Sequence, residues 1–134
     1  MIADRNVREM NVQALVQHFA QVAERLSEVN FELVSPMDMP GRDNFVRESE
    51  QLYAELTLVD AELRSRGREA RLALLELFDS PTLEVRLQAA VCSLGVAPTA
   101  ARAQLEQIAA TGWMEAISAQ GTLKALDKGT FKPD

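Results

Sequence analysis

Very few side chains in this sequence are suited to catalytic or metal chemistry. The chain contains one histidine, His18, and one cysteine, Cys92. General acid–base catalysis most often uses histidine, a nucleophilic cysteine needs an activating base nearby, and zinc needs several Cys or His ligands at short spacing. We therefore expect no catalytic residue, no cofactor site and no metal site. His18 is interpreted as a hydrogen-bonded histidine at the edge of a core, and Cys92 as a small core residue.

Acidic side chains are better placed for binding than for catalysis. Glu24, Glu28 and Glu32 follow one another at four-residue spacing, which places like charges side by side on a helix at a cost of about 0.2–0.5 kcal/mol per pair. Glu48 and Glu55, further along the chain, have no basic residue four positions on. These five residues form either a solvated acidic face or a docking surface for a basic protein, whose binding would offset the repulsion.

Two aromatic residues near the C-terminus are further candidates for partner binding. Trp113 directly follows Gly112 at an expected helix–helix turn. It either closes the end of a core or anchors an interface, since tryptophan is enriched in interface hot spots. Phe131 lies in the polar tail KGTFKPD, where it either folds back onto the last helix or contacts a partner.

The charge of the chain restricts the class of partner. Fourteen basic residues stand against twenty acidic ones, for a formal net charge of −6. This balance argues against a nucleic-acid-binding surface, because phosphate binding needs a basic face. The acidic excess is largest toward the N-terminus, so a partner chosen by electrostatics should be a basic protein that meets this part of the chain.

Length and composition favour one helical unit in a reducing compartment. The 134 residues are enough for one core, and 47% hydrophobic residues with only 5% aromatics indicate packing of Leu, Val and Ala between helices. The single cysteine permits no internal disulfide. The N-terminus lacks the pattern of a signal peptide, and no apolar run is long enough to span a membrane. We expect a cytoplasmic protein without membrane association.

Residues 1–67 are predicted to form a long helical hairpin. The first helix runs from Asn6 to about Val34, because apolar residues recur at the spacing of one helical face; they are Val7, Met10, Leu15, Phe19, Val22, Leu26, Val29 and Leu33. The segment SPMDMPG then forms a loop, and Asp43 caps a second helix that ends near Gly67. At about 28 residues, or roughly 40 Å, the first helix leaves apolar surface unpartnered, which favours a homodimer.

The remaining helices are shorter and repeat. Helices are expected over 69–78, from Pro81 to Gly95, from Pro98 to Gly112, and over 114–127 before Gly129. Apolar positions recur at an offset of thirty, with Leu75, Phe78 and Ala89 matching Leu105, Ile108 and Ala119. A repeat of this period is typical of a helical solenoid.

The predicted fold class is therefore all-α, with residues 1–134 as a single all-helical domain. The long hairpin of residues 1–67 precedes two short hairpins over 68–129, stacked as an α–α superhelix, and residues 130–134 form a tail.

The segment DSPTLEVRLQAAVCSL, Asp79 to Leu94, resembles the second half of a HEAT repeat, through Asp79, Pro81, Val85, Arg86, Ala89 and Ala90. With ELRSRGREARLALLELF before it, and VAPTAARAQLEQIAATG and LKALDKG after it, the chain resembles more narrowly a bacterial family known as domain of unknown function number two thousand and nineteen. The resemblance covers about residues 45–130. It implies a HEAT-like helical fold and an Asp79–Arg86 pair that links successive turns, and it implies no catalytic residue or cofactor.

Together these features predict a non-enzymatic helical-repeat protein that acts through protein–protein contact. An immunity or antitoxin-like protein that neutralises a basic toxin is one concrete version. The alternatives are a small enzyme that uses scattered carboxylates and a purely structural subunit of a homo-oligomer.

Overall fold

The computed structural model of the chain describes residues 4–34 and 40–134. All regular elements in these two ranges are helical: α1 (Asp4–Glu9), α2 (Val12–Leu33), α3 (Arg42–Ser65), α4 (Arg68–Leu72), the 3-10 helix η1 (Ala73–Asp79), α5 (Leu83–Ser93), α6 (Pro98–Ala109) and α7 (Met114–Lys128). The predicted all-α class is confirmed. No helix within the described ranges is both long enough and apolar enough to cross a membrane.

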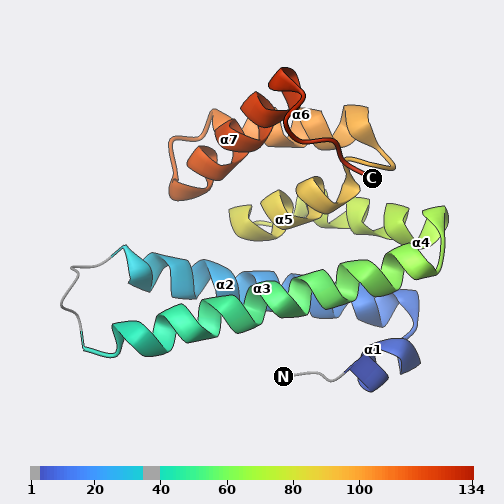
Figure 1. Ribbon diagram of the computed structural model, residues 1–134, viewed down its shortest axis with the longest axis horizontal. Helices are drawn as coiled ribbons and strands as arrows, with labels where there is room; N and C mark the ends of the chain where they lie inside the picture. Colours follow the sequence, from blue (N-terminus) through green and yellow to red (C-terminus); the bar gives the residue numbers. More distant parts are fainter. Residues whose placement is uncertain (1–3, 35–39) are drawn as a thin grey trace.

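The helices are arranged in three layers (Figure 1). The antiparallel helices α2 and α3 form the lower layer, α4, η1 and α5 the middle one, and α6 and α7 the upper one. The pair α2 and α3 extends well beyond one end of α5, while α7 overhangs the same end.

The first predicted helix is in fact two helices. The chain breaks between α1 and α2 because Asn11 caps α2, its Oδ1 accepting a hydrogen bond from the backbone N of Ala14 at 2.8 Å. An asparagine side chain satisfies a free N–H at a helix start in this way. Helix α2 therefore has 22 residues, and the argument for a homodimer from an overlong first helix loses part of its basis.

The ends of α3 follow the predicted turn residues with one correction. Gly41 precedes the helix in the left-handed region, with φ 82°, so Asp43 lies in the first turn and does not cap it. Gly67 adopts φ 102° after the C-terminus, a conformation that an L side chain adopts only with strain. Residues 35–39 of the predicted loop lie outside the described residues.

Between Gly67 and Gly95 the local structure differs from the prediction in detail. The helix expected over 69–78 is α4 followed by η1, and Pro81 precedes α5, whose N-cap residue is Thr82. Arg86 does not pair with Asp79; its Nε donates to Oε1 of Gln104 in α6 at 3.0 Å. Further on, α6 begins at Pro98 and α7 ends at Gly129, with φ 72°, as predicted.

The buried side chains form two clusters that meet at α5. The first lies between the lower and middle layers and includes Phe19, Val85 and Ala89. The second joins α5 to α6 and α7, and consists of Leu87, Ala90, Leu94, Ala101, Leu105, Ile108 and Ala119. Opposite faces of α5 thus contribute to different cores. Ala89 is completely buried, which agrees with the predicted register of this helix.

Candidate functional site

The single histidine lies where the sequence predicted, at the boundary of the core. His18 Nε2 is 3.2 Å from Oε2 of Glu55, and the two side chains form a hydrogen bond between α2 and α3. Glu55 is only 6% exposed. Its carboxylate links two helices of the same layer, so it does not contribute to a docking surface.

Cys92 is a core residue without the features of a nucleophile. Burial, together with a smaller contribution from the nearby charge of Asp60, raises the pKa of its thiol to about 12. A thiol with a raised pKa is not ionised near neutral pH and is a poor nucleophile. Within the described part of the chain, no group of three or more His, Cys, Asp or Glu side chains is arranged to hold a metal ion.

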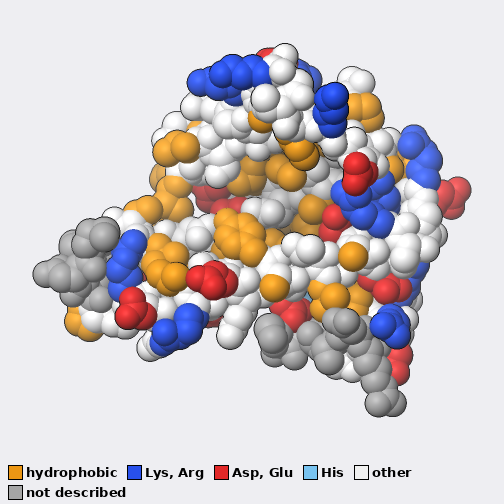
Figure 2. Space-filling model, in the orientation of Figure 1, with side chains coloured by type: hydrophobic (Ala, Val, Ile, Leu, Met, Phe, Trp, Pro, Cys, Tyr) orange, Lys and Arg blue, Asp and Glu red, His pale blue; other side chains and the backbone are white. Residues whose placement is uncertain are grey.

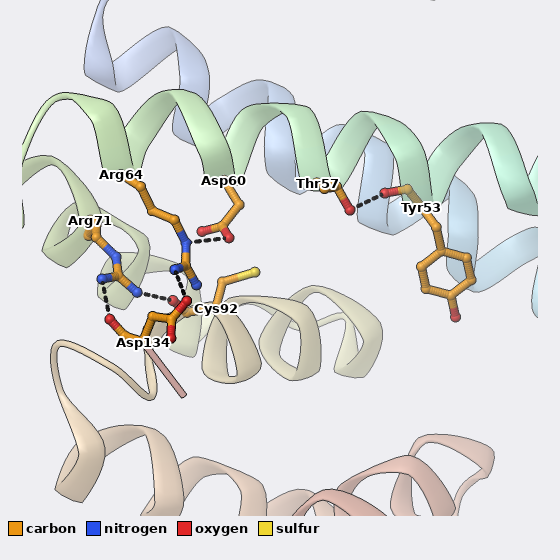
Figure 3. A network of polar contacts seen from close by, with 7 residues as sticks. All are labelled: Tyr53, Thr57, Asp60, Arg64, Arg71, Cys92 and Asp134. Carbon is orange, nitrogen blue, oxygen red and sulfur yellow. Dashed lines mark hydrogen bonds and ion pairs between the residues drawn. The ribbon is translucent and has the colours of Figure 1, made fainter. Parts of the chain in front are cut away.

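The polar groups around Cys92 hold the C-terminal residues in place (Figure 3). Arg71 donates from Nη1 to the backbone O of Asp134 at 3.0 Å and from Nη2 to the backbone O of Cys92 at 3.4 Å. Arg64 pairs with Oδ2 of Asp60 through Nε at 2.9 Å and with Oδ2 of Asp134 through Nη1 at 3.6 Å. These contacts tie the tail to α3, α4 and α5, a structural role.

The acidic ridge, defined here as Glu24, Glu28 and Glu32, lies on the exposed face of α2 as predicted. Arg25 lies among these residues, with Nη1 3.3 Å from Oε1 of Glu28. It also donates to Glu48 of α3 from Nε at 2.6 Å and from Nη2 at 2.9 Å. This hydrogen-bonded fork lowers the pKa of Glu48. Because Arg25 neutralises Glu48 and part of Glu28, the free charge of this face is smaller than the sequence indicated.

A second surface emerges only from the fold. The interlayer pocket, as we name it, has a volume of about 260 Å³ and is lined by Asn30, Leu33, Val34, Tyr53, Glu84, Met114, Glu115 and Ser118. Its lining comes from the end of α2, the middle of α3 and the first turns of α5 and α7. Figure 2 shows the recess between the layers, with apolar side chains around it and acidic ones within it.

Glu84 is the buried acid of this pocket. The residue is 4% exposed; Nδ2 of Asn30 donates to its Oε1 at 3.3 Å and Nε2 of Gln88 to its Oε2 at 2.7 Å. Burial raises the pKa of Glu84, and the charge of Glu115 adds to the increase. Burial also raises the pKa of Tyr53, with a further contribution from the charge of Glu84. The pocket thus keeps a carboxylate in an environment that disfavours its charge.

Apolar side chains are exposed around the same pocket. Val34 and Tyr53 belong to its lining and are large exposed hydrophobic residues, as are Trp113 and Ile117, the sequence neighbours of the lining residues Met114 and Ser118. Trp113 is 67% exposed: it occupies the N-cap position of α7 in extended backbone and does not close the core. Phe131, in contrast, packs against the second core. Of the two aromatic candidates, Trp113 is exposed and Phe131 is packed against the core.

The raised pKa of Glu84 predicts a pH-dependent stability. The folded state holds the Glu84 proton more tightly than the unfolded chain, whose glutamate pKa is about 4.3. Below the pKa of the unfolded chain, Glu84 is protonated in both states and its ionisation does not affect the free energy of unfolding. As the pH rises from that value through the raised pKa of the folded state, the free energy of unfolding falls, and above the folded-state pKa the loss is constant. Urea unfolding of Glu84→Gln and the native chain over a pH series should show the native chain losing stability relative to the variant as pH rises. A difference that does not change with pH would contradict the burial of this charge.

The three helical layers and the interlayer pocket describe an all-α protein with a recessed apolar and acidic surface. The pattern of the family described as Domain of unknown function (DUF2019) matches residues 13–127, and the chain belongs to this family. It is similar to the protein RPA1889 from Rhodopseudomonas palustris CGA009, whose crystal structure aligns with a TM-score of 0.83 and 36% identity over 96% of this chain and 98% of that one. A comparison with curated proteins finds no match.

Proposed function

We propose that this chain is a non-enzymatic, HEAT-like helical scaffold that binds a basic protein through the interlayer pocket and the acidic ridge. The observation that carries the proposal is the pocket itself, where exposed apolar side chains surround a buried carboxylate. An immunity or antitoxin-like role, in which the partner is a basic toxin, is the concrete version that we favour, in a bacterial and cytoplasmic setting.

The packing of the last helices supports the HEAT-like part of the proposal. The side chains of Ala89, Ala90, Ala101 and Ala119 are completely buried, and small residues allow the close approach that stacked helices need. The hydrogen bond from Arg86 to Gln104 connects the η1–α5 pair with the α6–α7 pair. Successive helical pairs thus contact through both apolar and polar side chains, as in a solenoid.

The exposed apolar residues support protein binding as the mode of action. Trp and Tyr are enriched among interface hot spots, where truncation to alanine costs about 2 kcal/mol or more of binding free energy. Tyr53 is exposed in the pocket lining that also contains Glu84 and Glu115, and the exposed Trp113 directly precedes Met114 of that lining. Charged groups beside such anchors increase the rate of encounter with a partner of opposite sign. A basic partner with apolar residues at its centre matches this surface best.

The test compares the two surfaces on a partner identified by affinity purification and mass spectrometry. Trp113→Ala should weaken binding by about 2 kcal/mol, or roughly thirtyfold, without a change in melting temperature because the side chain is exposed. Replacement of the three ridge residues, Glu24, Glu28 and Glu32, by Gln should slow association and reduce its salt dependence, since exposed charges act mainly on the rate of encounter. The same replacement should leave the stability unchanged or slightly higher, because it removes repulsion between like charges.

Two results would contradict the proposal. If neither set of variants changes binding, the partner uses another surface and the proposal is wrong. If light scattering gives twice the monomer mass and Trp113→Ala restores the monomer, the partner is a second copy of this chain, and the protein is a subunit of a homo-oligomer.

A further inference from the structure

The size of the interlayer pocket restricts what can enter it. Pockets that hold small-molecule ligands or cofactors usually measure about 300–1,000 Å³, whereas this one measures about 260 Å³. The walls come from four helices of all three layers. A space of this size, bordered by exposed apolar side chains, can hold a single inserted side chain.

The charge of the pocket selects a cation. Glu84 and Glu115, from the first turns of α5 and α7, both belong to the lining, which contains no basic residue in the described part of the chain. Burial and the charge of Glu115 raise the pKa of Glu84, whereas the hydrogen bonds from the neutral amides of Gln88 and Asn30 lower it and supply no positive charge. A cation between them would be attracted to both carboxylates and would relieve the repulsion.

The hydrogen bonds of Glu84 leave room for a further donor. An ionised carboxylate offers about four acceptor positions, and in Glu84 one donor from Asn30 and one from Gln88 occupy one position on each oxygen. These two amides also fix the orientation of the carboxylate before any ligand arrives. Each oxygen thus retains an acceptor position for an N–H group of an ammonium or a guanidinium.

The walls of the pocket suit the rest of a basic side chain. Lys and Arg pack their alkyl stems against apolar surface and keep the charged end in a polar environment, and Leu33, Val34 and Met114 supply such a surface here. The ring of Tyr53 lies in the same lining, and a cation over an aromatic ring is stabilised by the ring quadrupole. Stem and charged end therefore each have complementary neighbours.

We infer that the interlayer pocket receives one Lys or Arg side chain of a basic protein partner and that Glu84 is the residue that anchors it. This inference rests on the proposed function and specifies its chemistry: the partner presents the basic side chain flanked by apolar residues, which cover Val34, Tyr53 and Trp113. Glu115 supplies the second negative charge at the rim.

The probe for this inference is a phage-displayed library of random peptides selected on the full chain. Enriched peptides should contain a Lys or Arg next to apolar residues. For a synthetic peptide of the enriched sequence, replacing that Arg by citrulline, or that Lys by norleucine, should weaken binding by about tenfold or more. Chemical shifts of the ¹⁵N-labelled chain on peptide binding should change at Val34, Glu115 and Ser118.

The test variant of the protein is Glu84→Gln, and its matched control is Glu106→Gln. Glutamine keeps the shape of Glu84, and the amide of Gln88 can turn to accept a hydrogen bond from it, so the variant should fold. Glu84→Gln should weaken binding of the basic peptide by about tenfold and abolish its preference over the neutral analogue. Glu106, an exposed carboxylate of α6 paired with Arg102, should tolerate the same change without effect.

Three results would each overturn the inference. The selected peptides lack basic residues, no peptide is enriched, or Glu84→Gln binds the basic peptide as tightly as the native chain does. Its failure is distinguishable from failure of the proposed function. If Trp113→Ala weakens binding of the natural partner while Glu84→Gln does not, the proposed docking surface is supported and the role of Glu84 in binding a basic side chain is wrong. If neither of these variants nor the replacement of Glu24, Glu28 and Glu32 weakens that binding, both the inference and the proposed function are wrong.

Discussion

Phe19→Ala should lower the free energy of unfolding by about 3–5 kcal/mol, the range for truncation of a fully buried phenylalanine. Phe19 has no exposed surface and is the largest completely buried side chain among the residues that the structure describes. It lies in the first core, where α2 packs against α3 and α5. Single domains are stable by about 5–15 kcal/mol in total, so the variant should be close to unfolding. Urea denaturation followed by circular dichroism measures the change.

Phe31→Ala is the matched control for this experiment. Phe31 belongs to the same helix, α2, but is 67% exposed. A surface substitution of this kind usually changes stability by no more than about 0.5 kcal/mol. Equal losses in the two variants would show that the inner and outer faces of α2 are wrongly assigned.

Ala89→Leu should destabilise the protein by about 1–3 kcal/mol, because extra methylene groups in a packed core force side chains and backbone to move. Ala89 is completely buried in α5, which contacts α2, η1 and α6. The melting temperature should fall by several degrees. Ala103→Leu, on the exposed side of α6, should leave it nearly unchanged. An unchanged melting temperature for Ala89→Leu would mean that α5 does not bring Ala89 against its neighbours.

The parts of the fold that sequence predicted are those determined by local chemistry. Pro98 and Gly129 mark helix ends because their backbone preferences act within one turn, and Ala89 was assigned correctly because helical periodicity reports burial. The break at Asn11 is not predicted by periodicity, because the apolar spacing of α1 continues into α2 across the asparagine cap.

The candidate site was predicted less well, because its residues are brought together from distant parts of the chain. Glu84 looks like an ordinary acid in the first turn of a helix, and nothing local indicates that Asn30, 54 residues away, donates to it. Glu48 and Glu55 have no basic neighbour one turn further along their own helix, whereas their partners, Arg25 and His18, lie on α2. Pairing between helices is set by the tertiary fold and leaves no periodic signal.

The division of the interior into two cores has a consequence for the order in which the molecule opens. Leu105, Ile108 and Ala119 are buried with residues of α5 in the second core, whereas the larger side chains of α2 and α3 are buried in the first. Parts of a protein with separate cores can open with their own free energies, so we expect α6 and α7 to open before the lower layers, once the contacts of Asp134 with Arg64 and Arg71 have broken. Backbone amides of α7 should then exchange with deuterium faster than those of α2. Helix α7 carries Met114, Glu115 and Ser118 of the interlayer pocket. A partner bound in this pocket contacts α7 as well as α2 and α3, so it should slow the exchange of α7 amides and make α6 and α7 unfold together with the lower layers.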